Sequence, residues 1–192
     1  KDIEGKTGKR TTDYQDEFDY LVSSGITLEV DAISQPTYPL VQNAGKNLLK
    51  LYMNDIGLFT SILYGNNIKP ILNDECSINL GAVYENVVAQ ELKAHGFKLY
   101  YYDNKKNGKV DFLIDDADNF STMPIEVKSG IDYKKHSALD KFLCIKDYNI
   151  HKAMVVSNEQ KTFTKGQILY SPIYNIMFLE SADEAEPDEL FF

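Results

Sequence analysis

Two acidic residues and one lysine stand at a spacing that could support the hydrolysis of a phosphate ester. Asp111 lies in an apolar run, and further along the chain Glu126 and Lys128 alternate with Ile125 and Val127. A divalent cation held by two carboxylates polarises a phosphate oxygen and lowers the pKa of a bound water. A lysine beside it stabilises charge that develops on the phosphoryl group. We therefore take Asp111, Glu126 and Lys128 as the candidate catalytic residues.

The period of a β-strand gives these three residues their expected positions. Successive side chains of a strand point to opposite faces, so Glu126 and Lys128 share one face of their strand. The strand of Asp111 has the apolar residues Val110, Phe112 and Ile114 on one face. Asp111 is expected to point away from them. A polar connection joins the two strands, and antiparallel pairing would place Asp111 beside Glu126.

A metal ion would explain why carboxylates gather in such a place. Buried like charges repel one another and lose hydration, and a divalent cation removes much of that cost. Glu85, on a predicted helix, is the third carboxylate expected there. We predict Glu85, Asp111 and Glu126 as ligands of Mg²⁺ (or Mn²⁺), because this ion prefers oxygen ligands. Together with Lys128 they carry a formal charge of about −2, which one Mg²⁺ would cancel.

A simpler interpretation stands beside each of these assignments. Glu126 and Lys128 could form a cross-strand salt bridge, or lie on a solvated face of the sheet. Asp111 could be an acid next to a turn. Glu85 could be an exposed acid on its helix.

The elements that must position these residues follow an α/β order. Apolar periodicity and turn residues predict helices over 81–95 and 135–145, and strands over 98–102, 110–114, 124–129 and 153–156. Helix, three strands, helix and strand in this order predict a mixed central sheet flanked by helices.

The rest of the chain divides by composition. Residues 1–12 are polar and are predicted to be a linker, and residues 181–192 an acidic, disordered tail. Residues 13–40 combine a helix that stops at Gly25 with a short alternating strand and prolines, which resembles the remnant of a winged-helix unit. Residues 41–180 form the main predicted domain, in which Asp55 is expected to cap a helix.

Composition excludes several classes of protein. The 192 residues carry a formal net charge of −9, so avid nonspecific binding to DNA is not expected from overall charge. No apolar run is long enough for a membrane helix, and no signal peptide is visible. Cys76 and Cys144 belong to no metal-binding pattern and are expected to be free, buried thiols in a cytoplasmic protein. The chain begins with Lys1, so we expect a fragment of a longer protein.

The motifs resemble a known superfamily when their order and spacing are taken together. They are the run Gly81–Leu92 with Tyr84-Glu85-Asn86, the triplet Val110-Asp111-Phe112, and the run Pro124–Gly130 with Glu126-Val127-Lys128. This set is similar to the PD-(D/E)XK nucleases. More narrowly, residues 15–180 resemble an uncharacterised bacterial and archaeal domain that follows an AAA+ type ATPase module in one chain.

The resemblance implies a restriction-endonuclease-like fold, Mg²⁺-dependent cleavage of DNA, and an ATP-binding module missing from this fragment. One departure bears on activity. Members of that family often have an acid before the Val-Asp pair, and here the residue is Lys109. A lysine there could weaken metal binding or contact phosphate. The alternative is therefore a catalytically inactive nuclease-fold module that binds DNA or protein and regulates its ATPase.

Overall fold

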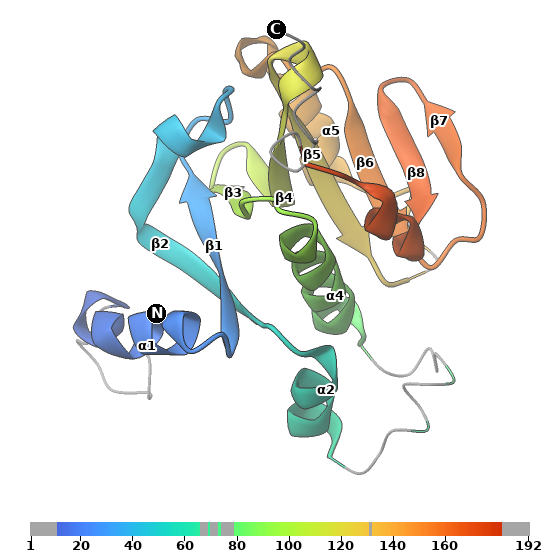
Figure 1. Cartoon of the computed structure of the whole chain (residues 1–192). Helices are drawn as coiled ribbons and strands as arrows, with labels where there is room; N and C mark the ends of the chain where they lie inside the picture. The colour runs from blue at the N-terminus through green and yellow to red at the C-terminus, as the bar shows by residue number, and fades with distance from the viewer. Residues whose placement is uncertain (1–10, 66–68, 70–72, 74–78, 131, 182–192) are drawn as a thin grey trace, which may run out of the picture.

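The short strands of the chain pair into one eight-stranded mixed sheet with the order β2-β1-β3-β4-β5-β6-β8-β7 (Figure 1). This computed structural model describes residues 11–65, 69, 73, 79–130 and 132–181. The predicted linker over 1–12 and acidic tail over 181–192 lie almost entirely outside these residues. The strands are β1 (Thr27–Ile33), β2 (Ala44–Met53), β3 (Tyr100–Asn104), β4 (Gly108–Asp116), β5 (Ser121–Lys128), β6 (Ala153–Ser157), β7 (Phe163–Lys165) and β8 (Ile168–Pro172).

Helices flank this sheet, which confirms the predicted α/β arrangement. The α-helices are α1 (Gln15–Ser23), α2 (Ile56–Tyr64), α4 (Gly81–Ala94) and α5 (Ser137–Leu143), and the 3₁₀ helices are η2 (Thr11–Tyr14), η3 (Leu40–Asn43), η4 (Ala117–Asn119), η5 (Lys146–Tyr148) and η6 (Ile173–Phe178). No helix in the described part of the chain is long and apolar enough to cross a membrane.

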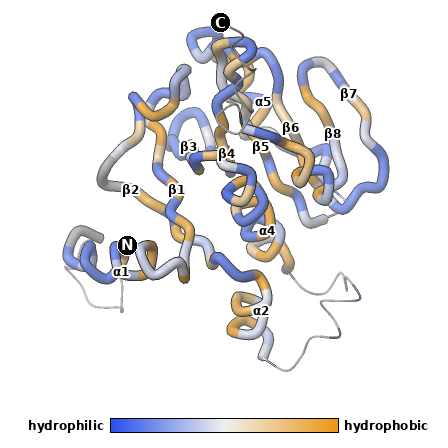
Figure 2. The backbone as a smooth tube through the Cα atoms, in the orientation of Figure 1, coloured by the Kyte–Doolittle hydropathy of each residue, from blue (hydrophilic) through white to orange (hydrophobic). Residues whose placement is uncertain are grey.

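The two faces of the central strands are covered by different helices. On one face, Val88 and Leu92 of α4 are buried against Phe112 and Ile125 of the sheet. On the other face, Phe142 of α5 belongs to a second buried cluster, which includes strand residues of β3, β4, β6 and β8. β5 is buried along almost its whole length, because both faces are covered. Figure 2 shows hydrophobic and hydrophilic residues alternating along α4, and hydrophobic residues on β5.

Strand directions change across the sheet. β3, β4 and β5 form an antiparallel unit, whereas β5, β6 and β8 run parallel. Antiparallel strands can be joined by tight turns, and parallel strands need a crossover. α5 lies in the crossover between β5 and β6, so the β5–α5–β6 segment is a βαβ unit.

The N-terminal hairpin belongs to the same sheet. β1 pairs antiparallel with β2 and parallel with β3, from Asp31–Tyr100 to Ile33–Tyr102. The winged-helix assignment for residues 13–40 stays a prediction, but its strand is part of the main sheet.

Two local predictions have clear outcomes. Asp55 caps α2 as predicted, because its Oδ1 accepts a hydrogen bond from the Leu58 amide at 2.7 Å. The prediction of a buried thiol is wrong for Cys144, which is exposed at the C-terminal end of α5, just beyond the helix residues that are buried in the core. Cys76 lies outside the described residues.

Candidate active site

A β-bulge in β4 sets the local geometry of the site. Tyr100 of β3 pairs with Leu113 and Tyr102 pairs with Val110, so one residue of β3 between them opposes two residues of β4. The bulge turns Val110 and Leu113 to the α5 face, while Phe112 stays on the α4 face. The predicted common face for Val110 and Phe112 is therefore wrong. An extra residue in a strand bends it and re-aims its side chains.

The bulge brings Asp111 to the point where β4 and β5 part. These strands pair antiparallel, as predicted, and their pairing ends at Phe112–Ile125. Beyond that pair the Val127 N–H donates to Asp111 Oδ2 at 3.0 Å, so the carboxylate takes the place of a strand carbonyl. Asp111 Oδ1 lies 3.2 Å from Lys109 Nζ. Asp111 is thus buried between the strands with both oxygens engaged.

Glu126 and Lys128 lie on β5 as the strand period predicts. Ile125 and Val127 belong to the core under α4, which places Glu126 and Lys128 on the opposite face. Lys128 Nζ donates to Glu126 Oε1 at 2.7 Å. Glu126 Oε2 is buried and has no hydrogen-bond partner among the described residues. Glu126 and Lys128 therefore share a face of β5, and Lys128 engages only one of the two Glu126 oxygens.

The electrostatics of Glu126 reflect a crowded pair of carboxylates. Burial and then the charge of Asp111 raise the pKa of Glu126 to about 7, against the lowering effect of Lys128 and Lys109. Two nearby carboxylates repel each other when both are ionised, and either a proton or a divalent cation relieves the repulsion. Glu126 therefore changes its charge close to neutral pH.

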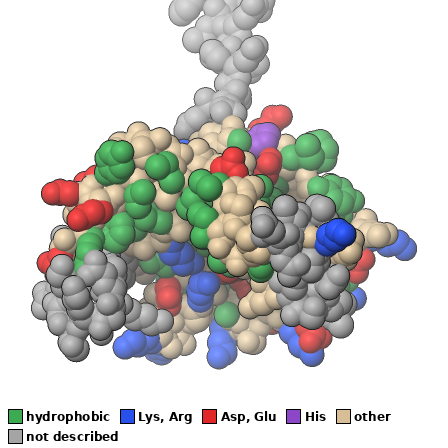
Figure 3. Space-filling view, turned by 90° about the horizontal axis from the view of Figure 1, so that it is seen from below, with side chains coloured by type: hydrophobic (Ala, Val, Ile, Leu, Met, Phe, Trp, Pro, Cys, Tyr) green, Lys and Arg blue, Asp and Glu red, His purple; other side chains and the backbone are tan. Residues whose placement is uncertain are grey.

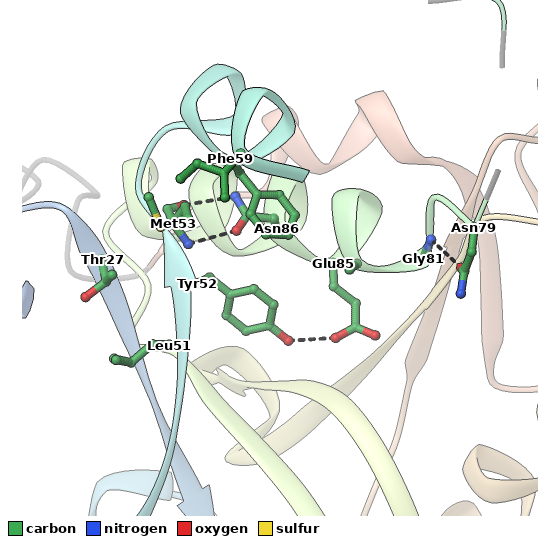
Figure 4. A pocket seen from close by; sticks show the side chains of 11 residues that line it. Thr27, Leu51, Tyr52, Met53, Phe59, Asn79, Gly81, Glu85 and Asn86 are labelled. Atoms are coloured by element: carbon green, nitrogen blue, oxygen red, sulfur yellow. Dashed lines mark hydrogen bonds between the residues drawn. The ribbon is translucent and has the colours of Figure 1, made fainter. Parts of the chain in front are cut away.

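Glu85 lies on α4 and is held by a tyrosine of β2 (Figure 4). Tyr52 Oη donates to Glu85 Oε2 at 2.7 Å. The neighbouring Asn86 fixes the helix to the same strand: its Oδ1 accepts from the Met53 N–H at 2.8 Å, and its Nδ2 donates to the Met53 carbonyl at 2.9 Å. These bonds direct Glu85 towards β2 rather than towards β5.

The three predicted metal ligands do not form one group. Within the described residues, no set of three or more His, Cys, Asp or Glu side chains is placed to hold a metal ion. Asp111 and Glu126 come together, and Glu85 stays with Tyr52. Its influence on the site is electrostatic, because it acts on the pKa of Lys109.

A lysine that sequence reasoning missed completes the cluster. Lys50 of β2 places its Nζ 4.2 Å from the centroid of the Tyr101 ring. Burial, followed by the charge of Lys109, lowers the pKa of Lys50 to about 8, against the raising effect of Asp111 and Glu85. The signal was a lysine inside the apolar run of residues 48–53. Only the pairing of β2 at the edge of the sheet shows that it belongs here.

Lys109 faces two opposing effects. Burial acts to lower its pKa, but Asp111 and Glu85 outweigh it, so the pKa is raised. The Lys109 side chain is 43% exposed while that of its partner Asp111 is 9% exposed, so Lys109 covers the carboxylate from the solvent side. Figure 3 shows basic and acidic side chains side by side in a hollow of the face seen from below.

The charge balance differs from the sequence prediction. The cluster has three carboxylates (Glu85, Asp111, Glu126) and three lysines (Lys50, Lys109, Lys128), whose formal charges cancel. Mg²⁺ is often held by only one or two carboxylates together with substrate phosphates. Of the two carboxylates that lie together, Glu126 has one oxygen, Oε2, that is buried and without a hydrogen-bond partner among the described residues. Asp111 would have to release Lys109 before both acids could hold a cation.

Comparison with protein families gives a match over the second half of the chain. Residues 80–176 match the model of a family described as "Domain of unknown function (DUF4143)". No curated protein and no solved structure matches the chain. The matched segment contains Glu85, Asp111, Glu126 and Lys128, whereas Lys50 precedes it.

Proposed function

The chain belongs to the DUF4143 family, and we propose that it is a PD-(D/E)XK nuclease-like domain that cleaves phosphodiester bonds of nucleic acid with Mg²⁺ or Mn²⁺. The observation that carries the proposal is the carboxylate pair of Asp111 and Glu126 at the parting of β4 and β5, with Lys128 on Glu126. The order α4, β3, β4, β5, α5, β6 supports a restriction-endonuclease-like arrangement. The proposed context is a longer AAA+ type protein with an ATP-binding module.

Each residue has a defined part in the proposed reaction. Asp111 and Glu126 would hold the cation, and Val127 keeps Asp111 in place through its N–H. The cation, when bound, polarises a phosphate oxygen and lowers the pKa of a bound water. Lys128 lies at the open end of β5 with its side chain 28% exposed, and it stabilises charge developing on the phosphoryl group.

Cleavage of plasmid DNA and of single-stranded RNA with Mg²⁺ or Mn²⁺ tests this proposal. Glu126→Gln and Lys128→Met should each lower the rate by roughly a hundredfold or more, which is typical for loss of a group that stabilises the transition state. Glu17→Gln, an exposed change on α1, should leave the rate unchanged. If both site variants cleave like the wild type, the observed activity does not belong to this site.

A second candidate function is supported by the cancelled charges. In an interaction module that regulates its ATPase, Lys109 and Lys128 would replace the cation permanently as partners of Asp111 and Glu126. Titration of the wild-type protein with Mn²⁺ in a calorimeter separates the two. Binding that is lost in Glu126→Gln favours the nuclease. A flat titration, together with no cleavage, favours the interaction module.

A further inference from the structure

The hydrogen-bond partners within the charged cluster leave one ammonium group without an acceptor. Asp111 accepts from Val127 and pairs with Lys109. Glu126 pairs with Lys128. Lys50 Nζ is buried and has no hydrogen-bond partner among the described residues.

The remaining acid does not fill that role. Glu85 accepts its hydrogen bond from the Tyr52 hydroxyl, and no ion pair joins it to Lys50 within the described residues. An ammonium group has three donors, and a buried donor without an acceptor is unfavourable. The Tyr101 ring below Lys50 offers its π-face, which attracts a cation but accepts no strong hydrogen bond.

Lys109 lies near the Lys50 ammonium group, on its solvent side. It lies close enough to Lys50 for each lysine to alter the pKa of the other. Its side chain is nearly half exposed, and within the part of the chain that the structure describes its ion pair is to Asp111. Two ammonium groups thus lie near one another, one enclosed and one at the surface, and of the two only Lys109 has an ion pair among the described residues.

We propose that Lys50 and Lys109 form an anion subsite that takes a backbone phosphate of nucleic acid next to Asp111 and Glu126. The choice of nucleic acid rests on the proposed function. A phosphate oxygen would supply the acceptor that Lys50 lacks, and a second oxygen would reach Lys109. Because the chain carries a net charge of −9, a polyanion would be held by local groups of cations such as this pair and not by the overall charge.

The subsite also gives Lys109 a role that its partner alone does not explain. A lysine paired only with Asp111 would neutralise that carboxylate. A lysine shared between Asp111 and a phosphate would place the phosphate beside the acid. The contact would come from β2 and β4 together, the two strands that carry Lys50 and Lys109.

The test measures binding of fluorescein-labelled DNA and RNA oligonucleotides by anisotropy, in EDTA so that cleavage does not intervene. Lys50→Met and Lys109→Met should each weaken binding by about tenfold, the effect of losing one charge-assisted contact. Each should also lower the slope of log affinity against log salt by about one. Lys106→Met removes the same charge from the nearby exposed turn and should change binding by less than about twofold.

Two further measurements test whether the charge of residue 109 matters and whether the ligand is nucleic acid or free phosphate. Lys109→Arg keeps the charge and should bind like the wild type, which excludes a merely structural effect of changing residue 109. Inorganic phosphate should compete with the oligonucleotide only weakly, because one phosphate lacks the neighbouring contacts of a strand. If phosphate binds in a Lys50-dependent way and the oligonucleotides do not, the ligand is free phosphate and the nucleic-acid subsite is wrong.

The remaining outcomes are decisive as well. No binding by the wild type, or equal binding by Lys50→Met, Lys109→Met and Lys106→Met, overturns the subsite. Cleavage is assayed separately, so the two proposals can fail independently. Lysine-dependent binding without cleavage refutes the nuclease and leaves the subsite. If cleavage is lost in Glu126→Gln but is unchanged in Lys50→Met, the subsite is refuted and the nuclease proposal stands.

Discussion

Replacing Glu126 by glutamine should remove most of the pH dependence of folding stability between about pH 4.5 and about pH 7. In the folded chain the pKa of Glu126 is raised from 4.5 to about 7, by burial and then by Asp111. In this window the folded protein keeps a proton that the unfolded chain has released. The free energy of unfolding therefore falls as the pH rises from about 4.5, and the loss is complete above about 7.

The magnitude follows from the width of that window. A difference of one pKa unit corresponds to about 1.4 kcal/mol, so the raised pKa of Glu126 predicts a loss on the order of 3 kcal/mol across the window. Glutamine keeps an oxygen that can accept from Lys128, and it carries no charge to be repelled by Asp111. Glu126→Gln should thus be more stable than the wild type at about pH 8 by a similar amount.

Urea denaturation across this pH range, without divalent cations, measures the effect. Glu17→Gln is the matched control, because Glu17 is an exposed acid on α1, and its pH profile should follow that of the wild type. A wild-type stability that is flat or rises between pH 4.5 and 7 would refute the reasoning. So would a Glu126→Gln profile that falls as steeply as the wild-type profile.

Two further changes test the supports of the site. Asn86→Ala should lower the free energy of unfolding by roughly 2 to 4 kcal/mol, because it leaves the Met53 N–H and carbonyl without these partners. Urea denaturation measures this loss. An Asn86→Ala protein as stable as the wild type would mean that α4 is not held to β2 in this way. Asp55→Ala removes the cap of α2 and should cost about 1 kcal/mol. Glu17→Gln, the exposed substitution on α1, serves for comparison, and an unchanged denaturation midpoint of Asp55→Ala would be the contrary result.

The local features of the site could be predicted from sequence, because they depend on the periodicity of side chains within a single helix or strand. The helix predicted over 81–95 is α4 at Gly81–Ala94, and its apolar stripe does face the sheet. The shared face of Glu126 and Lys128 follows from alternation within one uninterrupted strand. In each case a few neighbouring residues determine the outcome, so no knowledge of distant partners was needed.

The bulge in β4 and the approach of Lys50 to Lys109 could not be predicted, because both depend on pairing between distant segments. Alternation in residues 110–114 is broken only when β4 is matched to β3, where the three residues from Tyr100 to Tyr102 face four residues of β4. Lys50 reaches the site only because β1 pairs with β2 on one side and β3 on the other. The alternation of residues 110–114 gives no sign of the bulge, and the lysine inside the apolar run of residues 48–53 does not say which residues will lie beside it.

The hairpin outside the family match changes the charge of the site inside it. The matched residues 80–176 contribute Glu85, Asp111, Glu126, Lys109 and Lys128, three negative charges and two positive ones, a formal sum of −1. β2 supplies the third lysine and also Tyr52, the donor to Glu85. A site with a formal charge of −1 favours a cation, and a neutral one with an enclosed ammonium favours an anion beside the cation. If the proposed metal and phosphate both bind here, the N-terminal hairpin would thus shift the site from holding a metal alone towards holding a metal and a phosphate together.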